Sequence, residues 1–185
     1  FALTSRTNDY DVVITEIGGT VGDIESLPFL EAMRQFMHER GKNNSLCIHL
    51  TLIPYIRSAG EIKTKPTQHS VKTLLEIGIQ PDILLCRSEQ AISKDVRAKI
   101  GLFCNIDTDA VLQALDAKSI YEVPLNLKGE KLDEVVIKKL KLKCGKPNLA
   151  EWKKVVDKII TPQKEVTIGI CGKYNQVPDA YKSIL

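Results

Sequence analysis

Short apolar runs alternate along the chain with segments of helical spacing, and glycine, proline or asparagine residues separate them. The apolar runs that predict strands are rich in β-branched residues and occupy residues 10–17, 46–53, 82–86 and 119–124. Helical spacing predicts helices over residues 28–37, 67–77, 94–103, 128–143 and 147–160. This alternation predicts an α/β fold whose parallel sheet is covered by helices on both faces.

The character of the chain changes after about Leu125, where lysine-rich helical patterns begin. Thr161–Lys164 has the composition of a linker. The β-branched pattern of residues 165–171 then predicts the first strand of a new unit. The expected organisation is a first domain over residues 1–142, a linker over 143–164 and the start of a second domain over 165–185.

Composition excludes several classes of protein. The chain has 185 residues, of which 43% are hydrophobic and 26% charged, which is close to the globular average and argues against disorder or coiled coil. A net charge of +3 gives no indication of a nucleic-acid partner. No apolar run approaches the roughly 18 residues of a membrane helix, and no secretory signal is visible. The five cysteines contain no C-x-x-C pair, so we expect a reducing cytoplasm.

The first candidate site is a predicted strand that ends in an acid and continues into a glycine-rich turn. The sequence from Thr15 to Glu25 is TEIGGTVGDIE. Ligands of open α/β sheets bind beside the carboxyl ends of the strands, where a carboxylate such as Glu16 can hold Mg²⁺ against nucleotide phosphates. The glycines allow the backbone to approach a ligand closely. The alternative is a tight turn with a solvated acidic rim, and the sequence contains no Walker A motif.

The second candidate site, Ser58–Ser70, follows a predicted strand and is dense in hydrogen-bond donors. Lys63 and Lys65 lie with Thr67 at the start of a predicted helix. Two lysines and a hydroxyl at a helix N-terminus can bind an anion such as a polyphosphate. Gln68 can hydrogen-bond a base edge. The alternative is a solvated basic loop in which Thr67 caps the helix.

A third candidate lies in the predicted helix over residues 94–103. Lys99 and Phe103 are four residues apart and share a helix face. A cation beside an aromatic ring can meet the phosphate and the base of a nucleotide. The alternative is that Arg97 and Lys99 lie on a solvated face.

Several long stretches of the sequence resemble the CTP synthase family. They are Thr15–Phe29, Lys63–Ser70, Gly78–Asp82 with Cys86–Ser88, Val166–Tyr174 and Pro178–Ser183. The resemblance extends from about Asp9 to Leu185. It implies an amidoligase domain with a P-loop-NTPase-like fold, in which helices flank a parallel sheet. The N-terminal strands and the phosphate loop of that domain are absent from this sequence. A helical linker and the first strand of a class I glutaminase domain follow.

The resemblance also implies an activity and a set of partners. Such enzymes use ATP and Mg²⁺ to phosphorylate the 4-oxygen of UTP, and ammonia from glutamine then displaces the phosphate to give CTP. The resemblance implies a homotetramer formed through amidoligase domains, a cytoplasmic location and GTP as a candidate effector. Neither a nucleic acid nor a membrane is an expected partner.

Residue by residue, the resemblance assigns binding roles and no catalytic residue. Glu16 matches the Mg²⁺-binding acid. The matches to the CTP- and UTP-binding positions are Asp23, Ile24, Glu25, Lys63, Thr64, Lys65, Pro66, Thr67, Gln68 and Lys99. Glu31 and Phe103 are weaker candidates at the pyrimidine end. Leu115, Asp116 and Ala117 fall where the ATP base is held, largely by backbone groups.

Two of the family's functional parts have no counterpart in this sequence, namely the glycine-rich ATP loop and the glutaminase Cys, His and Glu. We therefore expect the chain to be the middle of a longer enzyme and to be inactive by itself. Two alternatives stay open. One is a non-catalytic module that binds pyrimidine nucleotides, and the other is a different ATP-dependent ligase of the same superfamily.

Overall fold

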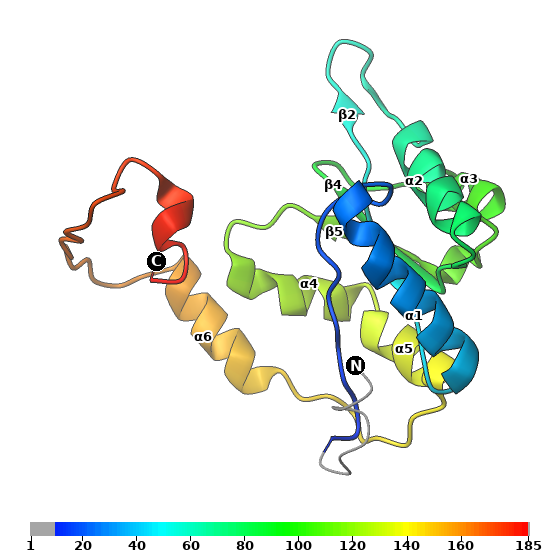
Figure 1. Cartoon of the computed structure of the whole chain (residues 1–185). Coiled ribbons are helices and arrows are strands. Elements are labelled where there is room, and N and C mark those ends of the chain that lie inside the picture. Colours follow the sequence, from blue (N-terminus) through cyan, green and yellow to red (C-terminus); the bar gives the residue numbers. More distant parts are fainter. Residues whose placement is uncertain (1–9, 185) are drawn as a thin grey trace. The chain divides into compact units, whose positions relative to one another are not determined.

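The computed structural model describes residues 10–184, which divide into one compact unit up to Asn148 and another from Leu149 onward. The first unit is built on a parallel sheet with the strand order β1-β4-β5 (Figure 1). Its strands are β1 (Ile48–Leu52), β4 (Ile83–Ser88) and β5 (Val111–Leu115). The predicted parallel sheet is confirmed, and β1 and β4 coincide with predicted strands.

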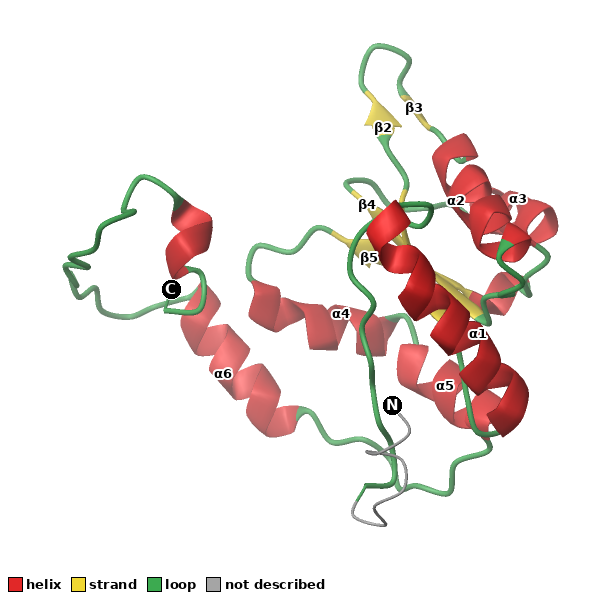
Figure 2. Ribbon diagram, viewed as in Figure 1, coloured by secondary structure: helices red, strands yellow, loops and turns green. Residues whose placement is uncertain are grey.

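Helices surround this sheet, and a small hairpin projects beyond it (Figure 2). The helices of the first unit are α1 (Leu27–Arg40), α2 (Lys65–Glu76), α3 (Lys94–Cys104), α4 (Val123–Gly129) and α5 (Leu132–Leu140). The hairpin consists of β2 (Tyr55–Ile56) and β3 (Glu61–Ile62), paired antiparallel. Single 3₁₀ turns are η2 (Ile24–Ser26), η3 (Thr108–Ala110) and η4 (Ile120–Glu122).

Side chains of β4 are buried on both faces of the sheet because successive residues of a strand point to opposite sides. Leu84 and Cys86 pack with Val71 of α2 and Ile100 of α3. Ile83 belongs to a separate cluster, against which α5 packs. The unit is therefore a helix–sheet–helix sandwich, as the near-continuous apolar sequence of β4 predicts.

Helix α1 forms an outer layer on α2. Leu30 of α1 and Leu74 of α2 share a cluster with Cys47 and Ile79, and Ile17 and Val21 pack against it. Gly22 approaches α2 so closely that an added Cβ would lie 3.4 Å from the Thr73 methyl carbon. The glycine-rich segment before α1 is thereby attached to the body of the unit.

Residues 10–17 form no strand, so that prediction is wrong for this structure. Val12, Val13 and Ile14 are exposed, and these residues pair with none of the strands in the described chain. β-Branched residues favour extended backbone, but a strand is stable only when a neighbour supplies hydrogen bonds and packing. Residues 165–171 likewise form no strand, and the predicted start of a glutaminase sheet is not confirmed.

The predicted strand over residues 119–124 is also wrong, and its sequence explains why. Ser119 and Glu122 form a capping box, in which the Ser119 hydroxyl accepts from the Tyr121 amide and the Glu122 carboxylate accepts from the Ser119 amide. This S-x-x-E arrangement initiates a helical turn, which becomes η4 and then α4. The predicted helix over residues 128–143 is interrupted because Lys131 adopts φ 62° between α4 and α5.

The second unit contains α6 (Ala150–Ile160) and the 3₁₀ turn η5 (Pro178–Tyr181). Helix α6 falls within the predicted helix over residues 147–160. Its Val156 is buried, whereas Val155 and Ile159 are exposed. No helix within residues 10–184 is long and apolar enough to span a membrane.

The buried histidine of β1 makes the stability of this fold depend on pH. The Nε2 atom of His49 lies 2.8 Å from the Ser70 hydroxyl of α2, and burial lowers the pKa of His49. The unfolded chain therefore binds a proton more readily than the folded chain as the pH falls through about 6.5. This difference favours the unfolded state at acidic pH.

We predict that the free energy of unfolding, measured by urea denaturation, falls between about pH 7.5 and pH 5. A His49→Gln variant should show a shallower decline, because its side chain carries no proton over this range. His38→Gln, on the exposed surface of α1, is the matched control and should retain the full decline. An unchanged slope in His49→Gln would show that His49 is not the group responsible.

Candidate functional site

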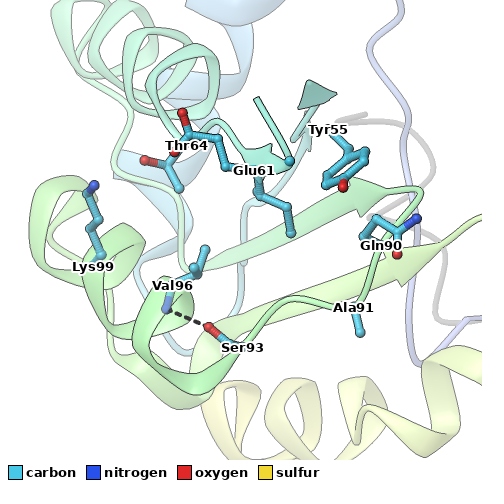
Figure 3. Close-up of a pocket in the computed structure, with 10 residues that line it drawn as sticks. Tyr55, Glu61, Thr64, Gln90, Ala91, Ser93, Val96 and Lys99 are labelled. Carbon is cyan, nitrogen blue, oxygen red and sulfur yellow. Dashed lines mark hydrogen bonds between the residues drawn. The ribbon is translucent and has the colours of Figure 1, made fainter. Parts of the chain in front are cut away.

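A pocket of about 470 Å³ lies beside the carboxyl ends of the strands (Figure 3). The register places Leu52 opposite Arg87 and Ser88 opposite Leu115, so all three parallel strands end at one edge of the sheet. The pocket wall comes from the hairpin, the start of α2, the loop after β4, and α3. Its lining includes Tyr55, Glu61, Thr64, Gln90, Ser93 and Lys99. Such an edge is where ligands of open α/β sheets bind.

The hairpin carries opposite charges to the mouth of this pocket. Gly60 turns the chain with φ 64°, a conformation that costs glycine little. The Lys63 ammonium donates to the Glu61 carboxylate and pairs with it. The hydrogen bond from Lys63, and the nearby charges of Lys63 and Lys99, lower the pKa of Glu61. A ligand with several negative charges can compete with Glu61 for these two ammonium groups.

Helix α2 starts at the pocket, with Thr64 before its first residue and Pro66 in its first turn. Thr64 is buried, and its hydroxyl accepts from the Gln68 side-chain amide at 3.1 Å. Lys65 and Pro66 are exposed. The first amides of a helix lack internal partners and favour anions, and the α2 N-terminus reaches the pocket at Thr64. The residues that line the pocket do not include Lys63, Lys65, Thr67 or Gln68.

Thr67 is completely buried and has a structural role in this arrangement. Its hydroxyl lies 3.1 Å from the Thr51 hydroxyl and 3.3 Å from the Leu52 carbonyl oxygen of β1. Thr51 in turn donates to Cys86 Sγ of β4 at 3.7 Å. The Thr67 side chain thus fastens the start of α2 to the sheet, and the helix N-cap is Thr64.

Two cations of α3 have different surroundings. Lys99 lines the pocket (Figure 3). Arg97 lies on another side of the helix, where it forms a bidentate ion pair with Glu130 at 2.7 and 3.2 Å. Its expected position on a solvated face is therefore wrong, since only 21% of its side chain is exposed. Phe103, one turn beyond Lys99, is 63% exposed.

The glycine-rich segment holds its acids outside the residues that line the pocket. Glu16 is exposed, and its carboxylate would lie 3.5 Å from a Cβ added to Gly18. Asp23 accepts from the Thr20 amide at 2.9 Å and so closes the turn before η2. Ile24 is exposed, as is Glu25.

No cluster of three or more His, Cys, Asp or Glu residues suited to a metal occurs within residues 10–184. A protein cage of carboxylates is therefore not formed around Glu16. Mg²⁺ commonly takes only one or two protein carboxylates and completes its shell with water and substrate phosphates. A single exposed carboxylate such as Glu16 fits that mode of binding.

The Glu31 carboxylate forms hydrogen bonds with side chains of its own helix, α1. It accepts from Arg34 at 2.8 Å and from Gln35 at 2.7 Å. These hydrogen bonds lower the pKa of Glu31 to about 2. Among the residues that the structure describes, Glu31 does not belong to the set that lines the pocket.

The candidate ATP segment, Leu115–Ala117, begins at the last residue of β5. The Asp116 amide donates to the Ser88 carbonyl at 3.3 Å, and its carboxylate accepts from Arg87 Nε at 3.0 Å. These bonds fix the segment at the same edge of the sheet as the pocket. The sequence patterns did not predict β5, nor Tyr55, Gln90 and Ser93 as residues that line the pocket. Only Ser93 gave a signal, as a serine immediately before a helical pattern.

Comparison with known proteins yields one family. Residues 2–142 match the family described as CTP synthase N-terminus. A CTP synthase of Carboxydothermus hydrogenoformans is 62% identical over 180 residues, which are 97% of this chain and 34% of that protein. A CTP synthase of Methanocaldococcus jannaschii is 63% identical over 175 residues, covering 95% of this chain and 32% of that protein. The chain thus spans about a third of the length of these relatives.

The role of Thr67 can be tested by stability. We expect Thr67→Val, which keeps the shape but removes the hydroxyl, to lower the free energy of unfolding by about 1 kcal/mol. Thr73→Val is the matched control, because the Thr73 hydroxyl bonds only within its own helix at an exposed site. Urea denaturation measures both. Equal stabilities of the two variants would contradict the structural role of Thr67.

Proposed function

The chain belongs to the CTP synthase family, and we propose that it supplies most of the amidoligase domain of such an enzyme. In this proposal the complete protein is a ligase that uses ATP and glutamine-derived ammonia to convert UTP to CTP. The observation that carries the proposal is the pocket at the carboxyl edge, because Lys99 and the α2 N-terminus meet there. That pairing suits a triphosphate.

UTP binds through its triphosphate to the basic side of this pocket. Lys63, Lys65 and Lys99 neutralise the phosphate oxygens, and the first amides of α2 donate to them. In the absence of UTP, the Glu61 carboxylate balances the positive charge of Lys63. When UTP binds, the Lys63 ammonium leaves Glu61 and pairs with the phosphate oxygens. Gln68 and the segment Asp23–Glu25 contribute contacts to the nucleotide. Thr67 supports these contacts by anchoring α2.

Glu16 is the carboxylate of this chain that would hold Mg²⁺. Mg²⁺ held there would supply positive charge for phosphoryl transfer. The backbone of Leu115–Ala117 holds the ATP base, at the sheet edge that also carries the UTP pocket. The two nucleotides would thus meet along one edge, as transfer of the γ-phosphoryl group to the UTP 4-oxygen requires.

The organisation of the longer enzyme is also part of the proposal. Residues 1–142 belong to the amidoligase domain, residues 143–164 form the linker, and residues 165–185 begin the class I glutaminase domain. Glutamine hydrolysis, a homotetramer formed through amidoligase domains and an effector role of GTP belong to the complete protein. That residues 1–185 alone make no CTP remains a prediction. The alternative function is that of a non-catalytic module that binds pyrimidine nucleotides. In that case the complete protein would bind UTP but would form no CTP.

The assignment of the basic loop predicts a selective loss of affinity. In the complete enzyme, Lys65→Ala should weaken UTP binding by about tenfold, through loss of a charge-assisted contact, and should leave ATP binding nearly unchanged. Lys72→Ala is the matched control, because Lys72 lies farther along α2 and pairs with Glu76. Calorimetric titration with each nucleotide measures both affinities. Equal losses for UTP and ATP would show that the loop is assigned wrongly.

The assignment of Glu16 predicts a change in the metal requirement. Glu16→Gln keeps the shape but removes the negative charge, so the Mg²⁺ concentration that gives half-maximal CTP formation should rise about tenfold or more. Glu39→Gln, an exposed acid near the end of α1, should leave this concentration unchanged. An unaltered Mg²⁺ dependence in Glu16→Gln would remove Glu16 from the metal site.

A further inference from the structure

Glu130 joins three elements behind the pocket wall. It follows α4, and only 18% of its side chain is exposed. Its carboxylate accepts both guanidinium branches of Arg97 on α3. The same carboxylate accepts from the Gln113 backbone amide at 3.2 Å and from its side-chain amide at 2.9 Å on β5. Burial would raise the pKa of Glu130, but the bonds from Arg97 and Gln113 outweigh it and hold the pKa below its usual range.

Arg97 and Gln113, the two partners of Glu130, both form hydrogen bonds with the backbone of Ile92 in the pocket wall. The Gln113 side-chain oxygen accepts from the Ile92 amide at 2.9 Å. Arg97 Nε lies 3.4 Å from the Ile92 carbonyl oxygen. Ile92 itself is buried, so both of its polar backbone groups are satisfied by side chains that Glu130 orients.

The residues beside Ile92 form one side of the pocket. Gln90 and Ser93 line it, and the Ser93 hydroxyl caps α3 by accepting from the Val96 amide. Lys99 lies on the helix that this cap begins. The loop after β4 leaves the sheet with little regular structure of its own, so side-chain bonds must determine where the wall lies.

We propose that Glu130 is a positioning residue for the nucleotide pocket. It holds Arg97 and Gln113 so that they clamp Ile92, and the clamp fixes the wall formed by residues 90–93 and the start of the helix that presents Lys99. Glu130 touches no ligand in this arrangement. That the pocket holds the UTP triphosphate rests on the proposed function, whereas the clamp itself is independent of the ligand's identity.

The test uses the complete enzyme with Glu130→Ala. We expect the KM for UTP to rise about fivefold to tenfold, because a charge-assisted bond network supporting one wall is lost. The kcat at saturating UTP and the KM for ATP should stay within about twofold. Glu130→Gln keeps one acceptor oxygen but turns an amide NH2 group toward donors of Arg97 and Gln113, so it should restore only part of the UTP affinity. Glu134→Ala is the matched control, because Glu134 forms an ion pair with Lys128 and takes no part in this network.

A ligand-free measurement distinguishes failure of the clamp from failure of the proposed function. Hydrogen exchange of the peptide covering residues 89–96 should be about tenfold faster in Glu130→Ala than in Glu134→Ala. Gln113→Met removes the acceptor for the Ile92 amide and should also speed hydrogen exchange of this peptide. This second variant provides the test of the clamp if Glu130→Ala does not fold. Unchanged exchange in Gln113→Met and in any folded Glu130→Ala overturns the clamp.

The kinetic measurements test whether Glu130 positions the nucleotide pocket. An unchanged KM for UTP, or equal increases of the KM values for UTP and ATP, overturns the role of Glu130 in positioning this pocket. If the unaltered complete protein forms no CTP from UTP, the proposed function fails, and the exchange measurement alone then decides whether Glu130 positions the wall.

Discussion

Parallel pairing of β4 with both β1 and β5 brings the carboxyl ends of three strands to a single edge of the sheet. The pocket and the candidate ATP segment both depend on this constraint. The hairpin and the start of α2 follow β1, the clamped loop and α3 follow β4, and the candidate ATP segment follows β5. Parallel strands need long connections, and those connections supply the pocket walls.

Buried side-chain bonds convert this topology into a defined site. The Thr67 hydroxyl attaches the start of α2 to β1, and the carboxylate of Glu130 attaches α3 to β5 through Arg97 and Gln113. Neither side chain needs to contact a ligand. Both hold in place the helices α2 and α3, and with them Thr64 and Lys99, which line the pocket.

Local sequence patterns predicted those elements whose patterns agree with their packing. The apolar run of β4 and the helical spacing of α3 gave correct assignments because both elements are buried on the faces that the pattern marks. β5 was missed because Val111 is the only β-branched residue of Val111–Leu115 and neither Gly nor Pro separates this strand from the preceding turn. Residues 10–17 were assigned wrongly because the pattern reports extended preference but not whether a partner strand is present. The strand predicted over residues 119–124 followed its β-branched residues and took no account of the S-x-x-E sequence from Ser119 to Glu122, which starts a helical turn.

Some residues of the candidate site could also be predicted from local sequence patterns, whereas others could not. The loop from Lys63 to Gln68 was identified from residue types at a predicted helix start, and Lys99 from the face that it shares with Phe103 in a predicted helix. The structure brings Thr64 and Lys99 to one pocket. Glu130 could not be identified from the sequence, because its role depends on contacts 17 and 33 residues away along the chain. Long-range pairs of this kind arise only from the completed fold.

In the proposed function, the pocket between the hairpin, α2 and α3 holds the triphosphate of UTP. The most direct test is a cryo-electron microscopy structure of the complete enzyme with UTP, Mg²⁺ and a non-hydrolysable ATP analogue. We expect UTP phosphate oxygens within hydrogen-bond distance of the Lys99 ammonium and of the first amides of α2. A triphosphate bound elsewhere, with Lys99 and the start of α2 facing only solvent, would contradict this proposal.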